Sequence, residues 1–448
     1  MTTPVSSRCA WKTATSRCSR AKGRCAAGTI FVTIQTFASL GLSDTLLRAL
    51  ADENYVAPTP IQYRAIPALL AGRDLLGIAQ TGTGKTAAFG LPLLQRLAEH
   101  RGRAKHRSAR ALILAPTREL AVQIDTSLRT YGRHYGFRHA VIIGGVSQSP
   151  QIGSMRQGVD VLVATPGRLL DLVNQGHIQL DEVSVLVVDE ADRMLDMGFV
   201  RDVRKIVSML PKQRQSMLFS ATMPDDVAKL VREMLHDPER VEVSPPTKTG
   251  DKIEQRVIHV EQKDKRALLS HLLEDAALKR VIVFTRTKHA ANRVSEHLDK
   301  AGISSGVIHG NKSQNARQRA LESFKAGRAR VLVATDIAAR GIDVDDISHV
   351  INYELPNEPE SYVHRIGRTA RAGTAGIAIS FCDPAERSYL RDIERLVRNE
   401  IEVISSALPA GVRSPANANE MPRAPGAPAR SYKKPKRRFH PRGNRRAA

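Results

Sequence analysis

One short segment has the composition of a phosphate-binding loop. Residues 79–86 read Ala-Gln-Thr-Gly-Thr-Gly-Lys-Thr, follow an apolar run and precede a helical pattern. Gly82 and Gly84 allow backbone N–H groups to converge on anionic oxygens, and the start of the following helix adds positive potential. Lys85 can reach the β- and γ-phosphates of a nucleotide, and Thr86 can hold Mg²⁺. The segment therefore predicts a nucleotide site.

A second segment supplies the acidic groups that hydrolysis needs. The apolar run Val185–Val188 reads as a buried parallel strand and leads into Asp189-Glu190-Ala191-Asp192. A carboxylate at Asp189 suits a Mg²⁺ ligand, and Glu190 suits orienting or deprotonating an attacking water. A loop or a solvated helix start would explain either segment alone. Both in this order predict nucleotide hydrolysis, although Ala79 stands where the usual loop pattern has glycine.

A third group of charges lies in the second half of the chain. Arg365, Arg368 and Arg371 recur every three residues, so a helix or tight loop would align them as a cluster for phosphate oxygens. A surface ladder of ion pairs is the alternative. Opposite a phosphate loop, the spacing favours arginines that stabilise the transition state of phosphoryl transfer.

These polar segments follow a repeated alternation of apolar runs and helical patterns, which is the signature of βαβ units. The predicted strands are Leu75–Ala79, Ala111–Ala115, Ala140–Ile143, Val159–Ala164, Val185–Asp189, Ser216–Ser220, Arg256–Val260, Val281–Thr285, Gly306–His309, Val331–Thr335, His349–Asn352 and Gly376–Phe381. We expect two doubly wound parallel-sheet domains, 36–243 and 251–405, joined by a flexible linker at 244–250. The second half has no glycine-lysine loop of its own, so it should complete the site of the first.

Charge is concentrated at the two ends of the chain. The 448 residues carry a net charge of +23, with six Lys/Arg and no acid in 1–35 and ten Lys/Arg and no acid in 421–448. Segments of this kind cannot bury enough apolar surface to fold alone. We expect disordered basic arms at 1–35 and 406–448 that attract polyanions, nucleic acid above all, or that act only as solubilising tails.

The cysteine spacing and the hydropathy pattern indicate in which cellular compartment the protein is expected. Cys9, Cys18, Cys25 and Cys382 form no CxxC pair, so neither a zinc site nor a disulfide framework is predicted and a reducing cytoplasm fits. No apolar run approaches the roughly 20 residues that span a bilayer. The first 35 residues resemble a transit peptide in composition but lack an apolar h-region, so we interpret them as an unstructured extension or a mis-assigned start.

At this point the motifs resemble those of the DEAD-box ATP-dependent RNA helicases, most closely the bacterial RhlE type with its basic tail. The resemblance covers about residues 36–405. Its motifs occur in family order: Phe37, 58–62, 79–86, Pro116–Leu120, Gly144-Gly145, Thr165–Arg168, Asp189–Asp192, Ser220–Thr222, Val283–Thr285, Gln314 with Arg317, 334–343 and His364–Arg371. The family resemblance implies two tandem RecA-like domains.

The resemblance also implies roles at an ATP site. Gln62 would read the adenine edge with Phe37 stacked on the base, and Asp343 would touch the ribose region. Arg368 and Arg371 would complete the site, and His364 would couple domain closure to hydrolysis through Asp192, Ser220 and Thr222. A turn residue and a structural histidine are the plain alternatives for Gln62 and His364. The implied ATP-binding loop residues are Thr81, Gly82, Thr83, Gly84, Lys85 and Thr86, with Mg²⁺ held by Thr86 and, through water, by Asp189.

RNA would be held, by the same resemblance, by backbone donors, small hydroxyls and arginines. These residues are Arg118, Gly145, Thr165, Arg168, Thr287, Arg317 and Thr335. Such groups suit phosphate and 2′-OH contacts, which position a strand without reading its sequence. Aromatic residues make up only 4% of the chain, so we predict little sequence specificity and no base-stacking platform.

The expected mechanism is an ATP-gated clamp in which ATP and single-stranded RNA both bridge the domains, and closure locally unwinds short duplexes or remodels RNPs. A monomer is expected, with ribosomal RNA and RNA-processing or ribosome-assembly proteins as partners. Three alternatives stay open: a clamp or annealer without unwinding, a DNA helicase, and a small-molecule kinase. Ala370 stands where the family usually has glycine, and a positive φ there would cost about 1 kcal/mol.

Overall fold

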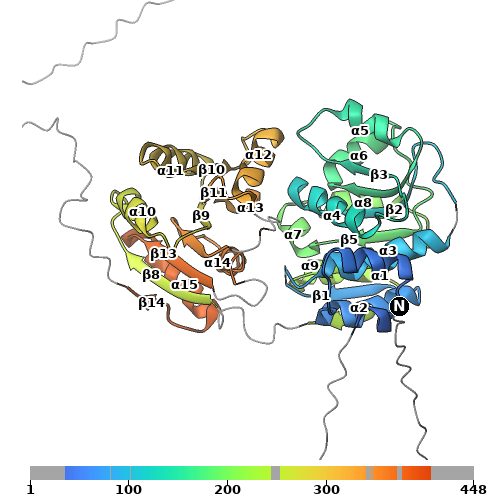
Figure 1. The fold of residues 1–448 in the computed structure, drawn as a ribbon, viewed down its shortest axis with the longest axis horizontal. Helices are drawn as coiled ribbons and strands as arrows, with labels where there is room; N and C mark the ends of the chain where they lie inside the picture. The colour runs from blue at the N-terminus through green and yellow to red at the C-terminus, as the bar shows by residue number, and fades with distance from the viewer. Residues whose placement is uncertain are drawn as a thin grey trace, which may run out of the picture.

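Two α/β domains follow one another along the chain in the computed structural model (Figure 1). The structure describes residues 36–80, 82–100, 102–243, 253–339, 344, 347–370 and 376–404. We refer to the elements from η1 to β7 as the first domain and to those from β8 to β14 as the second. The expected arms at 1–35 and 406–448 and the expected linker at 244–250 lie outside the described residues. None of the described helices has both the length and the apolar character needed to cross a membrane.

The first domain alternates strands with helices throughout. Its elements are η1 (Phe37–Leu40), α1 (Asp44–Asp52), α2 (Pro60–Leu70), β1 (Leu75–Ile78), α3 (Lys85–Glu99), β2 (Ala109–Leu114), α4 (Arg118–Tyr131), β3 (His139–Ile142), α5 (Gln148–Met155), β4 (Val159–Ala164), α6 (Pro166–Asn174), β5 (Val185–Val188), α7 (Ala191–Asp196), α8 (Val200–Ser208), β6 (Gln215–Ser220), α9 (Asp225–Met234) and β7 (Glu239–Glu242).

The second domain repeats this alternation. Its elements are β8 (Ile253–His259), α10 (Lys265–Glu274), β9 (Val281–Thr285), α11 (Lys288–Lys300), β10 (Ser305–Ile308), α12 (Gln314–Lys325), β11 (Val331–Thr335), α13 (Asp336–Ala339), β12 (His349–Asn352), α14 (Pro359–Ile366), β13 (Gly376–Cys382), η3 (Pro384–Glu386), α15 (Arg387–Val397) and β14 (Glu402–Val403).

The two sheets have the same strand order. All pairings are parallel, in the order β3-β4-β2-β5-β6-β1-β7 in the first domain and β10-β11-β9-β12-β13-β8-β14 in the second. Counted from its own first strand, each sheet therefore reads 3-4-2-5-6-1-7. The expected pair of doubly wound, RecA-like domains is confirmed.

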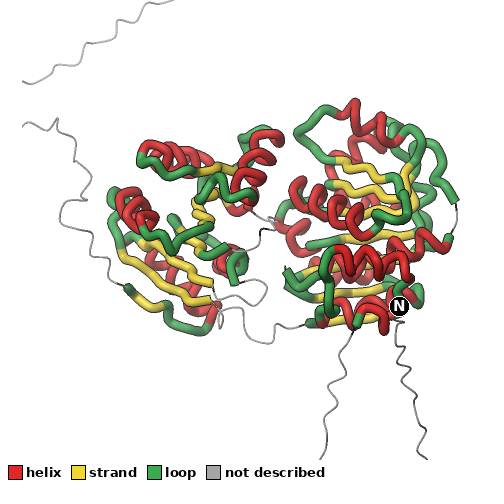
Figure 2. Tube along the Cα trace, viewed as in Figure 1, coloured by secondary structure: helices red, strands yellow, loops and turns green. Residues whose placement is uncertain are grey.

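Each sheet is buried on both faces, which explains why its strands read as apolar runs (Figure 2). On β5, Val185 and Val187 point into one core cluster of the first domain, while Leu186 and Val188 point into the cluster on the other face. The second domain has its own clusters. Because successive residues are both buried, only the strand ends are free to present polar groups.

Candidate functional site

The phosphate loop joins the end of β1 to the start of α3. Gly82 and Gly84 have φ values of 84° and 90°, a region that glycine enters without strain. Ala79 does not have a positive φ and is 2% exposed, so its methyl group fits where the usual pattern has glycine. At Gly82 and Gly84 the backbone thus has the conformation that a phosphate cradle requires.

Two buried side chains brace this loop. The Lys85 ammonium donates a hydrogen bond to the Ala79 carbonyl at 2.9 Å, which directs it across the loop. The Gln62 amide donates to the Gly84 carbonyl at 3.1 Å, and its oxygen accepts from the Thr59 backbone at 2.9 Å as part of a capping box at the start of α2. Gln62 therefore has a structural role at the loop, in addition to the adenine contact that the resemblance implies.

The aromatic residue predicted to stack on the base lies close to this helix start. Phe37 is 4% exposed and its ring packs edge-on against Tyr55, with 6.1 Å between ring centroids. Tyr55 in turn packs edge-on against Tyr131. The contact with a base stays a prediction.

The two acidic residues at the end of β5, Asp189 and Glu190, are both buried, but their pKa values shift in opposite directions. Burial raises the pKa of Asp189 to about 6, against the opposing charge of Lys85. Burial would also raise the pKa of Glu190, but the charges of Arg193, Lys85 and Arg368 outweigh it and hold that pKa below its ordinary value. Glu190 is ion-paired with Arg193 and has a φ of 52°, so the turn into α7 is strained at this residue.

The Asp189 carboxylate has the character of a divalent-cation ligand. It is 3% exposed, accepts one hydrogen bond from the Glu190 backbone at 2.9 Å and forms no ion pair within the described part of the chain. A buried carboxylate that no ion pair occupies suits Mg²⁺, which is usually held by one or two protein groups together with phosphate oxygens and water. The residues present therefore fit the metal that the resemblance implies.

The third acidic residue, Asp192, connects the Asp189–Asp192 motif to the Ser220–Thr222 motif. Asp192 accepts hydrogen bonds from the Thr222 hydroxyl and backbone at 2.9 Å and from the Ala221 backbone at 3.1 Å. Its own backbone N–H donates to the Ser220 hydroxyl at 3.2 Å. His364, half-buried in the last turn of α14, belongs to the second domain, and its coupling to this group stays a prediction.

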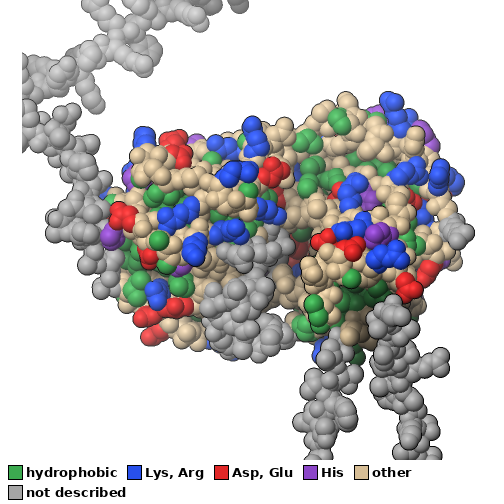
Figure 3. Space-filling model, viewed as in Figure 1, with side chains coloured by type: hydrophobic (Ala, Val, Ile, Leu, Met, Phe, Trp, Pro, Cys, Tyr) green, Lys and Arg blue, Asp and Glu red, His purple; other side chains and the backbone are tan. Residues whose placement is uncertain are grey.

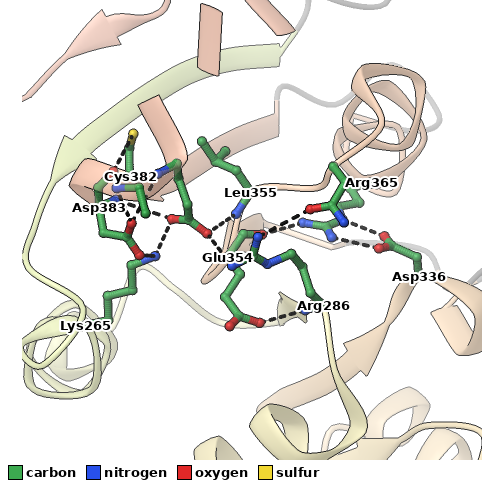
Figure 4. Close-up of polar contacts among 11 residues, drawn as sticks. Lys265, Arg286, Asp336, Glu354, Leu355, Arg365, Cys382 and Asp383 are labelled. Atoms are coloured by element: carbon green, nitrogen blue, oxygen red, sulfur yellow. Dashed lines mark hydrogen bonds and ion pairs between the residues drawn. The ribbon is translucent and has the colours of Figure 1, made fainter. Parts of the chain in front are cut away.

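Arg365 does not join the row of arginines that the sequence predicted. Arg365 is 1% exposed and turns inward, where its guanidinium holds both carboxylate oxygens of Asp336 at 2.6 and 2.8 Å (Figure 4). The aligned cluster was therefore wrong for Arg365, because α14 ends at Ile366 and the three-residue spacing no longer keeps one face. Arg368 lies beyond that end, and its charge lowers the pKa of Glu190 across the domain boundary.

Four candidate RNA residues lie along one edge of the first domain, where β2, β3 and β4 end. The Arg118 guanidinium covers Gly145 so closely that a Cβ atom there would lie 2.0 Å from its nitrogen. Arg168 donates to the Val146 carbonyl at 3.1 Å, and the Thr165 backbone donates to Ile142 at 3.0 Å. The structure brings Arg118, Gly145 and Arg168 together as one polar edge.

The candidate RNA residues of the second domain also follow strand ends. Thr335 ends β11, and Thr287 caps α11 by accepting a hydrogen bond from the Ala290 backbone at 3.1 Å. Arg317 on α12 is 8% exposed, and burial lowers its pKa. These three residues are predicted to hold the same strand as the polar edge of the first domain.

A direct contact joins the domains beside this candidate RNA surface. Glu119 on α4 is 4% exposed, accepts a hydrogen bond from the Gln314 amide at 3.0 Å and forms an ion pair with Arg317 at 2.9 Å. The sequence motifs include all three residues but give no sign that they meet. Arg193, one residue beyond the Asp189–Asp192 motif, and Asp336, inside the 334–343 motif, were missed in the same way.

Three expected site residues, Thr81, Asp343 and Arg371, lie outside the described residues. Next to the last of them, Ala370 has a φ of 56°. The positive φ that would make alanine costly at this position is therefore present.

Comparisons with known proteins agree with this geometry. The family model described as "DEAD/DEAH box helicase" matches residues 59–230, and the one described as "Helicase conserved C-terminal domain" matches residues 264–373. The ATP-dependent RNA helicase CshA of Listeria monocytogenes is 43% identical over 372 residues, which is 83% of this chain and 70% of the relative. The chain belongs to the DEAD-box helicases. It has the family's Asp-Glu-Ala-Asp sequence at 189–192.

Other relatives support the same assignment for this DEAD-box helicase. CshA of Geobacillus kaustophilus is 42% identical, over 82% of this chain and 78% of the relative. The solved structure of S. cerevisiae Dbp5 bound to RNA and ADP BeF3 is 33% identical and aligns with a TM-score of 0.73, over 83% of this chain and 95% of that one. The protein is an ATP-dependent RNA helicase with two helicase domains.

Proposed function

We propose that this helicase works as an ATP-gated clamp on single-stranded RNA. The observation that carries the proposal is that the domains face each other through functional groups at two places. Arg368 acts electrostatically on Glu190, and Glu119 binds Gln314 and Arg317. Ligands that bridge these places favour the closed arrangement by their differential affinity for it. Closure bends one strand of a short duplex and releases the other, with little sequence specificity.

At the ATP site, we assign phosphate binding to the loop residues Thr81, Gly82, Thr83, Gly84 and Lys85. Thr86 and, through water, Asp189 would hold Mg²⁺, which would supply charge neutralisation at the phosphates. Glu190 orients the attacking water, and the depressed pKa of Glu190 keeps it charged for this purpose. Arg368 and Arg371 stabilise the transferred phosphoryl group. Gln62 and Phe37 bind adenine, and Asp343 binds the ribose region.

For RNA, we assign the polar edge of the first domain (Arg118, Gly145, Thr165 and Arg168) together with Thr287, Arg317 and Thr335 of the second. The proximity of Arg118 to Gly145 and the interdomain position of Arg317 support a continuous track. Coupling between the two sites passes through His364, Asp192, Ser220 and Thr222. The hydrogen bonds of Asp192 to the Ser220–Thr222 segment support this path.

The wider assignments are also proposals. We divide the chain into a basic extension (1–35), two helicase domains (36–243 and 251–405), a linker (244–250) and a basic tail (406–448). The relatives described above are named CshA, so the RhlE type rests only on the basic tail. We also propose a cytoplasmic monomer with RNA-processing or ribosome-assembly proteins as partners. The basic ends of the chain support action on structured RNA such as ribosomal RNA.

Steady-state ATP hydrolysis with and without single-stranded RNA tests the clamp. We expect strong stimulation by RNA, none by DNA of the same sequence, and loss of turnover in Glu190→Gln. Equal turnover without nucleic acid would refute the clamp and favour a small-molecule kinase. Stimulation by DNA would favour a DNA helicase, and a strand-displacement assay separates unwinding from annealing.

A further inference from the structure

A concave, positively charged cavity lies in the second domain, apart from the ATP and RNA residues assigned above. Its volume is about 280 Å³, and it is formed where α10 begins, beside α11 and the end of β12. Its lining includes the charged and aromatic side chains of Lys263, Lys265, Arg266, Arg293, Tyr353 and Glu354. Figure 3 shows Lys and Arg side chains gathered on the face of this domain that is turned to the viewer.

Of the four cationic side chains that line this cavity, one is held in ion pairs and three are exposed and could bind an anion. Lys265 is 1% exposed and is ion-paired with Asp383 and Glu386, so it forms a fixed floor (Figure 4). Lys263, Arg266 and Arg293 are exposed and form no ion pair with any described residue. The acidic lining residue Glu354 already accepts a hydrogen bond from the Arg286 backbone at 2.7 Å.

A tyrosine in the same cavity brings an unpaired hydroxyl to it. Tyr353 is 8% exposed, and its ring packs against Phe381 with 6.0 Å between centroids. Within the described ranges its hydroxyl has no hydrogen-bond partner. Burial raises its pKa to about 12, against the charges of Arg266 and Arg293, so the phenol stays protonated and is a hydrogen-bond donor. A protonated hydroxyl near two arginine charges suits an anionic acceptor.

We propose that this cavity, formed by Tyr353, Arg266, Arg293 and Lys263, binds a phosphate group. Arginine forks match phosphate oxygens, the first turn of the ten-residue helix α10 adds backbone N–H donors, and the tyrosine supplies a neutral one. The volume lies near the lower end of small-molecule sites, roughly 300–1,000 Å³. It suits a phosphate with part of its sugar better than a whole nucleotide.

The position of the cavity identifies RNA as a source of that phosphate, a step that rests on the proposed function. The cavity residue Ala290 donates its backbone hydrogen bond to Thr287, an assigned RNA contact. Arg293 lies on α11 six residues after Thr287, which corresponds to about 9 Å of helix rise. A strand that passes Thr287 can therefore continue to this cavity. A free polyphosphate offers the same chemistry.

Two variants of the full chain test the proposal. Arg266→Gln/Arg293→Gln removes two charges, and Tyr353→Phe removes only the hydroxyl and keeps the buried ring. The matched control, Lys300→Gln/Arg391→Gln, removes two exposed cations of the same domain that form no ion pair with described residues. With the phosphate loop filled by a non-hydrolysable ATP analogue, the probes are a short single-stranded RNA limited to the assigned contacts, a longer one, and inorganic tripolyphosphate.

The arms distinguish the sources of phosphate. If RNA occupies the cavity, the double variant loses on the order of tenfold in affinity for the longer RNA. Its salt slope falls by about 0.7 per lost phosphate contact, while short-RNA binding is unchanged. Tyr353→Phe then lowers affinity a few-fold, by about one neutral hydrogen bond, without changing the slope. Loss of tripolyphosphate binding alone would identify a free phosphate ligand. Unchanged binding of all three probes, or equal losses in the control, would overturn the proposal. Failure of the unaltered chain to bind RNA would defeat the proposed function instead.

Discussion

Replacing Glu119 by glutamine should open the two domains without unfolding either of them. Glu119 is 4% exposed and contacts Gln314 and Arg317, which belong to the other domain. A glutamine retains an acceptor for Gln314 but leaves the Arg317 guanidinium, itself 8% exposed, without its counter-ion. Loss of one partner from a buried, hydrogen-bonded charge pair costs about 2–5 kcal/mol.

The domains can avoid most of this cost by separating. Arg317 then returns to water, so the penalty appears as a change in the opening equilibrium. A shift of 2–3 kcal/mol corresponds to about 30- to 150-fold in favour of the open arrangement. Each domain keeps its own core clusters, and the melting temperature should therefore change little.

Single-molecule energy transfer between one dye on each domain, without RNA, measures the opening. The control is Glu182→Gln, which breaks the exposed ion pair with Lys105 inside the first domain and should leave the distribution unchanged. In a double-mutant cycle, Arg317→Gln combined with Glu119→Gln should cost at least 1–2 kcal/mol less than the sum of the single changes. An unchanged distance distribution in Glu119→Gln, or a lower melting temperature, would refute this reasoning.

Three further outcomes are expected. Ala370→Gly should raise the free energy of unfolding in urea by up to about 1 kcal/mol. The left-handed conformation costs alanine roughly 1–2 kcal/mol, and the greater entropy of glycine in the unfolded state offsets only part of the gain. A decrease in the free energy of unfolding would exclude strain at this residue. Because the folded-state pKa of Asp189 is about 6, above the ordinary 3.8, its contribution to stability is full below about pH 4 and lost as pH rises through 6. Asp189→Asn should remove that slope from the pH dependence of unfolding, and an identical slope would contradict the raised pKa. Truncation after residue 408 should weaken RNA binding and reduce its salt dependence, and unchanged salt titrations would eliminate the tail as an RNA tether.

The sequence was sufficient to predict the sheets because parallel strands buried on both faces leave continuous apolar runs. Twelve predicted runs lie on strands of the structure, and the polar motifs follow their ends. The edge strands β7 and β14 were missed. In β7 only Val241 is buried among charged neighbours, so hydropathy gives no signal there.

Side-chain partners were much harder to predict than backbone elements. Glu119 and Gln314 are 195 residues apart, and nothing local to either residue indicates the other. The arginine spacing led to a wrong orientation for Arg365, since a three-residue repeat keeps one face only while the helix lasts. Because the family pattern has glycine at this position, the sequence predicted that Ala370 would be strained if its φ were positive. The value of φ could be known only from the structure.

The repeated strand order has a practical consequence. Since each half has its own sheet and core, a cut between β7 and β8 should leave two fragments that fold separately. The catalytic groups would then be divided between two molecules, with Lys85 and Glu190 on one and Arg368 on the other. Mixed together, the fragments would form a split enzyme whose reassembly depends on nucleotide and RNA, and a reporter attached to each would make the pair a sensor for single-stranded RNA.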